Sequence, residues 1–347
     1  MSLTIHTGDA LQTLRALPSE SVQCVITSPP YYGLRDYNSE KQIGLEPTVQ
    51  EYIANLVNVF RECRRVLKKD GTLWLIIGDS YCSSDKWGGT SGNKNTTSAA
   101  GGFIAAKRVK NTATMQRSNQ ANDFTGAPNR RPQQGIKPKD LFMVPHRMAI
   151  AMQDDGWHIR QDIVWEKANA MPESVRDRPT RSHEYIFLCA RSRNYYYNAA
   201  AIREEAKWFQ ENGRGSGVGW HRGGIKNIER ERRAGMPVKL DKAQLCTRNK
   251  RSVWTVPTAP YLEAHFATFP PKLIEPCILA GTRPGDTVLD PFFGAGTTAL
   301  VAIQHGRSAI GIELNPDYVA MAHHRINAAL GLLASAATAI DSSAPSV

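Results

Sequence analysis

The 347-residue sequence predicts an α/β fold with a mostly parallel central sheet. Short apolar runs of strand length alternate with amphipathic segments of helical period, which is the pattern of strand–helix–strand units with crossover helices. The alternation fills an N-terminal part of the chain and returns in a C-terminal part. Two of the expected strands end in loops rich in proline or glycine, and open α/β sheets bind ligands at such strand ends.

The N-terminal part begins with a predicted strand over 3–6 and a helix for which Asp9 is the cap, because Leu11, Leu14 and Leu17 recur at helical spacing. The elements expected next are a strand over 22–26, an amphipathic helix over 49–67 and a strand over 72–77. The segment Lys68-Lys69-Asp70-Gly71 is expected to end that helix, since cations followed by glycine are favoured at helix C-termini.

Residues 83–140 break the alternation. They are rich in Ser, Gly, Asn, Gln and basic residues and have little periodicity, so we expect a long, mobile insertion. Order resumes with a helix from Leu141 to about Asp155 and a strand pair near 157–165 and 184–190. The later elements expected are helices over 271–280, 299–305 and 316–330, strands over 287–289 and 308–312, and a disordered tail over 332–347.

Charge and composition restrict the function. The net charge is +11, and residues 85–140 and 203–251 each carry +7, so the rest of the chain is close to −3. Such concentration favours a polyanionic partner, most simply nucleic acid, with solvated basic loops as the alternative. No apolar run reaches the roughly 18 residues of a membrane span, and there is no signal-peptide pattern. The six scattered cysteines show neither a CxxC pair nor zinc spacing, which predicts a cytoplasmic protein without structural metal.

The stretch Ser28-Pro29-Pro30-Tyr31 follows the strand over 22–26. Two prolines exclude helix and remove two backbone donors, so the chain leaves the strand as a stiff, extended loop. A serine hydroxyl, two carbonyls and a tyrosine ring are thereby held where α/β sheets bind ligands. On its own the stretch is equally compatible with a proline-rich turn capped by a half-buried tyrosine.

A second loop, Asp290-Pro-Phe-Phe-Gly294-Ala-Gly296-Thr-Thr298, follows a strand and opens a helix, and Glu313 ends the next strand. Glycines let the backbone approach a ligand, and a strand-end carboxylate can bind both ribose hydroxyls, so the pattern fits an adenosine-containing cofactor. Asp290 would repel a pyrophosphate but attract the ammonium group of a methionine. The loop therefore favours S-adenosylmethionine over NAD, with a solvated strand-end acid as the alternative for Glu313.

Together, Ser28-Pro-Pro-Tyr31, the loop from Asp290 to Thr298 and Gly311-Ile-Glu313 resemble the motifs of DNA amino-methyltransferases. Their order is similar to that of the permuted beta group, in which the catalytic loop precedes the cofactor loop. Further matching segments are Thr7-Gly8-Asp9-Ala10, Trp165-Glu-Lys167-x-Asn169, His183-Glu184 and His265-Phe-Ala-Thr-Phe-Pro270. The resemblance covers nearly the whole chain except the two basic blocks and the tail. It implies a Rossmann-like, circularly permuted, S-adenosylmethionine-dependent methyltransferase fold.

The resemblance implies methyl transfer from S-adenosyl-L-methionine to the exocyclic amino group of a base flipped out of double-stranded DNA. The Ser28 side chain and the Pro29 carbonyl are the implied acceptors for the amino N–H groups, Pro30 stiffens the loop, and Tyr31 would stack on the base. The implied cofactor contacts are Asp290 at the methionine amino group, Gly294 and Gly296 beneath the sulfonium and ribose, Glu313 on the ribose, Asp9 at the adenine, and Phe269, Phe292 and Thr298 in the pocket wall. A helix cap is the alternative role for Asp9.

The resemblance also divides the chain into segments. These are 1–82 and 141–202 (catalytic-loop half), 83–140 (basic insertion), 203–260 (target recognition), 261–331 (cofactor-binding half) and 332–347 (tail). The candidate DNA contacts are Arg176, Arg178, Arg181, His183, Arg214 and Arg222, each with a surface or structural role as the alternative. A bacterial or phage-encoded protein is expected, and a homodimer, a cognate restriction nuclease and an orphan or phage-type enzyme are left open.

Other functions are less favoured. The motif order and basic blocks argue against a protein-glutamine or RNA methyltransferase, and the intact motifs argue against a non-enzymatic DNA-binding protein. Pro276-Cys277 has the dipeptide that enzymes methylating carbon 5 of cytosine use for covalent attack, but it lies inside a predicted amphipathic helix, so Cys277 is expected in the core. Within the resembled family, Ser28 in the first loop position favours N4 of cytosine, with N6 of adenine a close second.

Overall fold

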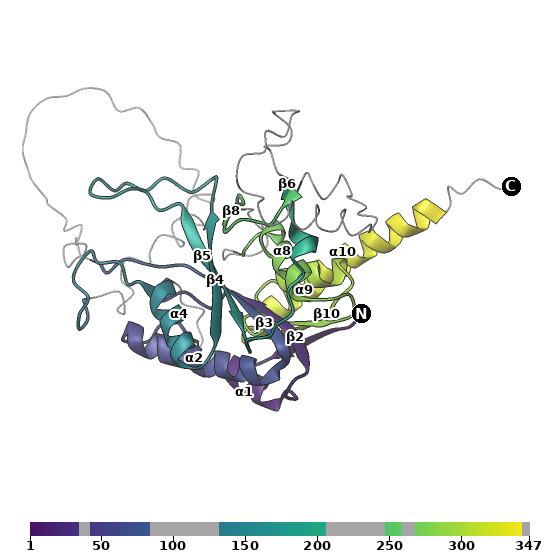
Figure 1. Ribbon diagram of the computed structural model, residues 1–347, viewed down its shortest axis with the longest axis horizontal. Coiled ribbons are helices and arrows are strands. Elements are labelled where there is room, and N and C mark those ends of the chain that lie inside the picture. The colour runs from purple at the N-terminus through teal and green to yellow at the C-terminus, as the bar shows by residue number, and fades with distance from the viewer. Residues whose placement is uncertain (35–41, 84–131, 206–246, 259–267, 342–347) are drawn as a thin grey trace, which may run out of the picture.

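The structure is a computed structural model that describes residues 1–34, 42–83, 132–205, 247–258 and 268–341. Its centre is an eight-stranded mixed sheet (Figure 1). The strands are, in spatial order, β1 (Leu3–Thr7), β10 (Ser308–Glu313), β9 (Thr287–Asp290), β2 (Val22–Thr27), β3 (Leu67–Ile77), β5 (His183–Ala190), β4 (His158–Glu166) and β8 (Val253–Thr255). The first five run parallel, β5 is antiparallel to both its neighbours, and β8 is parallel to β4. The prediction of a mostly parallel sheet is confirmed.

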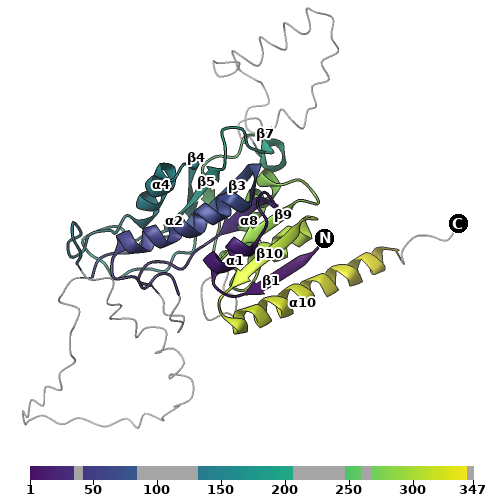
Figure 2. The ribbon, with the colours of Figure 1, turned by 90° about the horizontal axis from the view of Figure 1, so that it is seen from below.

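Helices cover both faces of this sheet (Figures 1 and 2). One face is covered by α1 (Ala10–Ala16), α2 (Val49–Val66) and α4 (Val144–Asp154), and the other by α8 (Pro271–Gly281), α9 (Thr297–Gln304) and α10 (Pro316–Asp341). A short 3₁₀ helix, η3 (Ala199–Ile202), lies beside α8, and β6 (Glu204–Glu205) pairs with β7 (Thr247–Arg248) in a separate two-stranded sheet.

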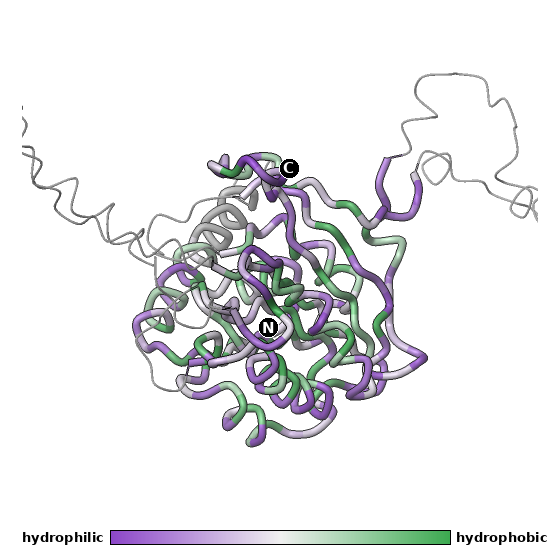
Figure 3. The backbone as a smooth tube through the Cα atoms, turned by 90° about the vertical axis from the view of Figure 1, so that its left-hand side faces the viewer, coloured by the Kyte–Doolittle hydropathy of each residue, from purple (hydrophilic) through white to green (hydrophobic). Residues whose placement is uncertain are grey.

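The strands are apolar because both of their faces are covered. Successive residues of a strand point to opposite faces. In β2, Val25 therefore belongs to the core under α1, α2 and α4, whereas Cys24 and Ile26 belong to the core under α8, α9 and α10. Figure 3 maps this pattern on the backbone, with apolar stretches running through the interior. The centre of the sheet is thus rigid enough to position loops at its edge.

The helix starts follow the local sequence. The Asp9 carboxylate accepts a hydrogen bond of 2.8 Å from the Gln12 amide, so the predicted cap of α1 is confirmed. The segment 68–71 does not end α2 as predicted. The helix stops at Val66, and these residues already belong to β3. Strand pairing decides this: a Cβ on Gly71 would lie 2.9 Å from the Gln23 carbonyl oxygen, so glycine permits the close approach of β2 and β3.

Three predicted boundaries shift. Within the expected insertion 83–140, the described part is folded: Ile136 is buried, and the Gln133 side chain donates to Tyr32 and accepts from the Val49 amide. Within 203–260, β8 extends the central sheet and buries Trp254. The expected tail continues α10 as far as Asp341, since its alanine-rich sequence has high helix propensity. Residues 84–131, 206–246, 259–267 and 342–347 lie outside the described part.

The remaining composition-based predictions concern cysteine, metal and membrane. The five cysteines within the described ranges are free and buried, and Cys277 is a fully buried residue of α8, as predicted. No cluster of His, Cys, Asp or Glu that could hold a metal ion occurs in the described part of the chain. Among the helices described, none combines the length and apolar character needed to cross a membrane.

Candidate active site

The two predicted loops leave neighbouring strands at the point where the chain direction diverges. From β9 the chain runs through α9 to β10, whereas from β2 it runs through α2 to β3 on the opposite side and across the opposite face. Divergence of this kind opens a crevice at the carboxyl ends of the two strands, the usual ligand site of an open α/β sheet. Ser28 follows β2 and Pro291 follows β9, so both loops begin at this divergence point.

Asp290 joins the two strand ends. Its two carboxylate oxygens accept hydrogen bonds of 2.6 Å from the Thr27 hydroxyl and 2.7 Å from the Thr298 hydroxyl, and Oδ1 also accepts from the Phe292 amide at 3.1 Å. The side chain is almost completely buried, and this burial raises the pKa of Asp290 to about 7. A carboxylate in that environment would be strongly stabilised by a nearby cation. Thr27 has no distinguishing sequence signal beyond its place before Ser28.

The two glycines of the second loop differ in what they permit. Gly294 has φ +51° and open space where a Cβ would lie, so the backbone there is accessible to a ligand. Gly296 has φ +75°, and its missing Cβ would lie 3.1 Å from Ala322 and Ile326 of α10. Gly294 is therefore suited to a cradle, and Gly296 to close packing of the loop on the last helix.

Glu313 lies over the same loop from the end of β10. Its carboxylate accepts from the Gly294 amide at 2.7 Å and from the Asn315 amide at 2.9 Å, and burial raises the pKa of Glu313. Each oxygen retains acceptor capacity for a ligand hydroxyl. The Glu313 carbonyl also accepts from the Gly8 amide at 2.9 Å, which brings Asp9 to the same edge.

The predicted aromatic residues of the pocket wall lie on different faces. Phe292 packs, half-buried, against the core under α1, α2 and α4, whereas Phe269 packs against the core under α8, α9 and α10. Thr298 is buried and bonded to Asp290. The structure thus brings Asp9, Asp290, Gly294, Gly296, Thr298 and Glu313 together at one edge of the sheet.

The proline loop is held from two sides. The Tyr52 hydroxyl donates to the Pro30 carbonyl at 2.8 Å, and the Tyr31 hydroxyl donates to Glu184 Oε2 at 2.6 Å. Ser28 Oγ donates to the Tyr31 hydroxyl oxygen at 3.4 Å. Burial and the negative charge of Glu184 raise the pKa of Tyr31 well above its ordinary value, so this tyrosine remains protonated. These hydrogen bonds therefore hold Ser28 in a fixed position beside the cofactor loop.

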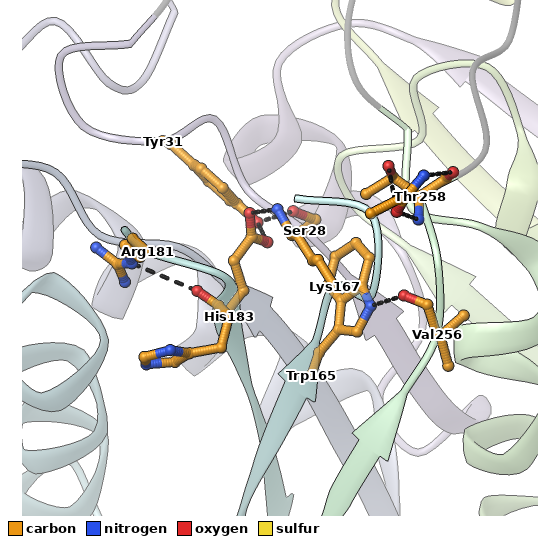
Figure 4. A network of polar contacts seen from close by, with 10 residues as sticks. Ser28, Tyr31, Trp165, Lys167, Arg181, His183, Val256 and Thr258 are labelled. Atoms are coloured by element: carbon orange, nitrogen blue, oxygen red, sulfur yellow. Dashed lines mark hydrogen bonds and ion pairs between the residues drawn. The ribbon is translucent and has the colours of Figure 1, made fainter. Parts of the chain in front are cut away.

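Glu184, Lys167 and Gly78 complete this arrangement. Glu184 is the second residue of β5 and is paired with Lys167, whose ammonium lies 4.7 Å from the centre of the Trp165 ring (Figure 4). A Cβ on Gly78 would lie 2.6 Å from the Tyr31 ring, so glycine is needed there for the ring to fit. Sequence reasoning assigned no role to these residues. The available signal was that these residues lie in the Trp165-Glu-Lys167 and His183-Glu184 motifs. The motifs do not indicate which residues Lys167 and Glu184 contact.

The candidate DNA contacts differ in exposure. Arg176 is exposed, whereas Arg178 stacks 4.0 Å over the Tyr81 ring and donates to Glu173 at 2.6 Å. Arg181 Nε donates to the His183 carbonyl at 3.3 Å (Figure 4). Arg178 and Arg181 thus hold the 173–183 segment together. Arg214 and Arg222 lie outside the described residues.

The site combines a glycine loop that begins with Asp290, a strand-end carboxylate and a proline loop. All three lie where the parallel sheet diverges. This combination defines the class of S-adenosylmethionine-dependent methyltransferases. The residues present fit that cofactor: open backbone at Gly294, acceptor capacity on Glu313 and a buried carboxylate at Asp290. Residues 22–324 match the family model of N6 and N4 methyltransferases, described as DNA methylase. The chain belongs to this family.

The chain is also similar in sequence and in fold to known DNA methyltransferases. The chain is 46% identical over 323 residues to the Type II methyltransferase M.Cfr9I of Citrobacter freundii, covering 93% of this chain and 87% of that protein. Its fold is similar to that of the PvuII DNA methyltransferase (cytosine-N4-specific), with a TM-score of 0.57, 17% identity and coverage of 94% and 86% of the two chains. It is also similar to that of the protein TTHA0409 of Thermus thermophilus in its complex with S-adenosyl-L-methionine, with a TM-score of 0.53, 21% identity and coverage of 94% and 93%.

These findings confirm the predicted class of activity. The protein is a site-specific DNA methyltransferase that modifies an exocyclic amino group, either cytosine N4 or adenine N6, with S-adenosyl-L-methionine as its cofactor. Its fold is the α/β fold of such enzymes, as expected from the sequence.

Proposed function

We propose that this enzyme methylates N4 of cytosine within a specific DNA sequence, using the loop Ser28–Tyr31, and that it belongs to the permuted beta group. The observation that carries the proposal is the 2.6 Å hydrogen bond between Thr27 and Asp290, which sets the serine loop directly beside the cofactor loop. The catalytic loop precedes the cofactor loop in the chain, which supports the permuted order. Serine in the first loop position favours cytosine.

The proposed chemistry begins with the target amino group, a poor nucleophile because its lone pair is delocalised into the ring. Ser28 Oγ and the Pro29 carbonyl accept hydrogen bonds from its two N–H groups and draw the nitrogen towards tetrahedral geometry, which frees the lone pair. Tyr31 stacks on the flipped base. When bound, S-adenosylmethionine supplies an electrophilic methyl group. The surplus proton of the methylated nitrogen leaves to solvent.

The proposed cofactor contacts are those that the edge of the sheet brings together. Asp290 attracts the methionine ammonium, the Gly294 backbone lies against the ligand, and Glu313 binds the ribose hydroxyls. Asp9 approaches the adenine, while its carboxylate also caps α1. Gly296 supports the loop by packing on α10, and Thr298 supports Asp290 through its hydroxyl.

The DNA-facing residues and the partners are also proposals. Arg176, Arg214, Arg222 and the two basic blocks would supply phosphate and base contacts. The Type II designation of M.Cfr9I supports pairing with a cognate restriction nuclease in the cytoplasm of a bacterium. A homodimer and an orphan or phage-type enzyme stay predictions.

The experiment is to express the chain in bacteria that lack DNA methylation and to sequence the DNA with base-modification detection. N4-methylcytosine at a recurring sequence supports the proposal. N6-methyladenine at such a sequence would retain the enzyme class and correct the base, and the absence of any modified site would refute the activity.

Ser28→Ala tests the catalytic loop. We expect methyl transfer to fall by about 10² or more, the order of loss for removing a positioned polar contact, with cofactor affinity unchanged. The measurement is tritiated-methyl incorporation into DNA that carries the identified sequence. Unchanged turnover would exclude Ser28 from the reaction.

A further inference from the structure

The polar residues behind Ser28 form a chain of hydrogen bonds with a defined direction (Figure 4). The Lys167 ammonium contacts Glu184 Oε1, the Tyr31 hydroxyl donates to Glu184 Oε2 at 2.6 Å, and Ser28 Oγ donates to the Tyr31 oxygen at 3.4 Å. Lys167 follows the last residue of β4, Glu184 is the second residue of β5, and Tyr31 belongs to the proline loop. The two ends of the β4–β5 connection therefore meet the proline loop, which lies much earlier in the sequence, behind one hydroxyl.

The direction follows from which atoms can donate. A lysine ammonium only donates, and an ionised carboxylate only accepts. Tyr31 must therefore give its proton to Glu184, and its oxygen is left as an acceptor for the Ser28 proton. With that proton directed towards Tyr31, the remaining acceptor sites of the Ser28 oxygen can face a ligand.

We infer that Glu184 is a positioning residue that acts through Tyr31 to orient the Ser28 hydroxyl as a hydrogen-bond acceptor for the target amino group. The inference rests on the proposed role of Ser28 and adds what makes this hydroxyl suitable for it. A free serine hydroxyl can donate or accept, and a donated proton would repel the N–H groups of the target. The Glu184 carboxylate removes this ambiguity between donor and acceptor by fixing the direction in which the Tyr31 hydroxyl donates.

The surroundings keep the chain in place. The side chains of Glu184 and Lys167 are 15% and 23% exposed, so the ion pair is only partly screened by water. The Lys167 ammonium lies over Trp165, whose indole N–H donates to the Val256 carbonyl at 2.8 Å. Gly78 gives the Tyr31 ring room to reach Glu184. Partial burial strengthens these contacts, and the neighbours restrict the alternative geometries.

Glu184→Gln tests the direction with little change of shape. Because Lys167 can only donate, the glutamine amide oxygen should turn towards Lys167 and the NH₂ group towards Tyr31. The Tyr31 hydroxyl would then accept from the amide and donate to Ser28. We expect kcat to fall about 10- to 100-fold, as for other residues that orient an active-site group, with KM for S-adenosylmethionine unchanged.

The double variant Glu184→Gln with Lys167→Met gives a readout that a purely structural role would not produce. Without the ammonium, the amide can turn its oxygen back to Tyr31, so we expect the double variant to recover part of the kcat that Glu184→Gln loses. Glu166→Gln is the matched control. This neighbouring carboxylate ends β4 and accepts from the Thr255 hydroxyl at 2.6 Å, outside the chain to Ser28, so its kcat should stay unchanged.

The measurement is steady-state methyl transfer to a DNA duplex carrying the sequence that the expressed enzyme modifies, with thermal unfolding and cofactor affinity measured in parallel. Wild-type kcat in Glu184→Gln, or no recovery in the double variant, would overturn the inference. If Glu184→Gln does not fold, Tyr31→Phe is the alternative, because it removes only the hydroxyl that links Glu184 to Ser28. Wild-type kcat in Tyr31→Phe would also overturn the inference. Full activity in Ser28→Ala would instead refute the proposed role of Ser28, whatever Glu184 does.

Discussion

Asp290→Asn should make the stability of the ligand-free protein less dependent on pH. Burial raises the pKa of Asp290 from 3.8 to about 7, so the folded protein binds this proton more tightly than the unfolded chain does. The sign follows from linkage: the stability contributed by the protonated form is fully present below pH 3.8 and is lost as pH rises through about 7. Asparagine has no such titration and can still accept from one of the two threonine hydroxyls.

The expected magnitude follows from the two pKa values. A shift from 3.8 to about 7 corresponds to roughly 4 kcal/mol of lost stability well above pH 7. Between pH 6 and pH 8 only part of this stability is lost. The free energy of unfolding of the wild type should fall by about 1 kcal/mol relative to that of the asparagine variant. The assay is urea unfolding of both proteins, without cofactor, at the two pH values.

The control is Asp286→Asn, which removes a carboxylate that accepts from Lys68 Nζ at 3.2 Å, away from the cofactor loop. Its stability difference from the wild type should not acquire the same pH dependence. Equal differences between wild type and Asp290→Asn at pH 6 and pH 8 would show that Asp290 does not titrate near pH 7, and would refute the reasoning about its environment.

Three further predictions concern the cofactor, the loop and the core. S-adenosylmethionine should bind more tightly as pH rises from 6 to 8, because its ammonium favours the ionised Asp290; calorimetry that finds no pH dependence would contradict the proposed contact. Gly78→Ala should reduce methyl transfer by about tenfold or more, since overpacking of about 1–3 kcal/mol would push the Tyr31 ring, whereas Gly331→Ala, where a Cβ meets nothing, should leave turnover unchanged. Cys277→Ala should keep full turnover while lowering stability by about 1–2 kcal/mol in urea unfolding, and a loss of methyl transfer without unfolding would reopen covalent catalysis by this thiol.

Local sequence was sufficient wherever the physical cause is local. Asp9 was predicted as a cap from its place before a helical apolar pattern, and its carboxylate caps α1. Cys277 was placed in the core from the pattern of its helix, and it is buried there. The segment 68–71 was misassigned because its end-of-helix chemistry is a weak local preference, which the pairing of β2 with β3 overrides.

The active site shows the same division. The resemblance of two short motifs, about 260 residues apart, to those of DNA amino-methyltransferases carried the prediction of the activity and of S-adenosylmethionine as the cofactor. The partners of those motifs could not be predicted in this way. Thr27 and Asp290 are 263 residues apart, and Tyr31 and Glu184 are 153 apart.

By itself, then, the sequence determined the strand–helix alternation, the stiffness of the serine loop and the open backbone of the cofactor loop, because each depends on a few adjacent residues. Only the tertiary structure decided which carboxylate faces which hydroxyl, because strand order places β9 beside β2 and β5 beside β3. Hydrogen bonds act over a few ångströms in space and have no fixed separation along the chain. That is why Glu184 became part of the site only when the sheet was assembled.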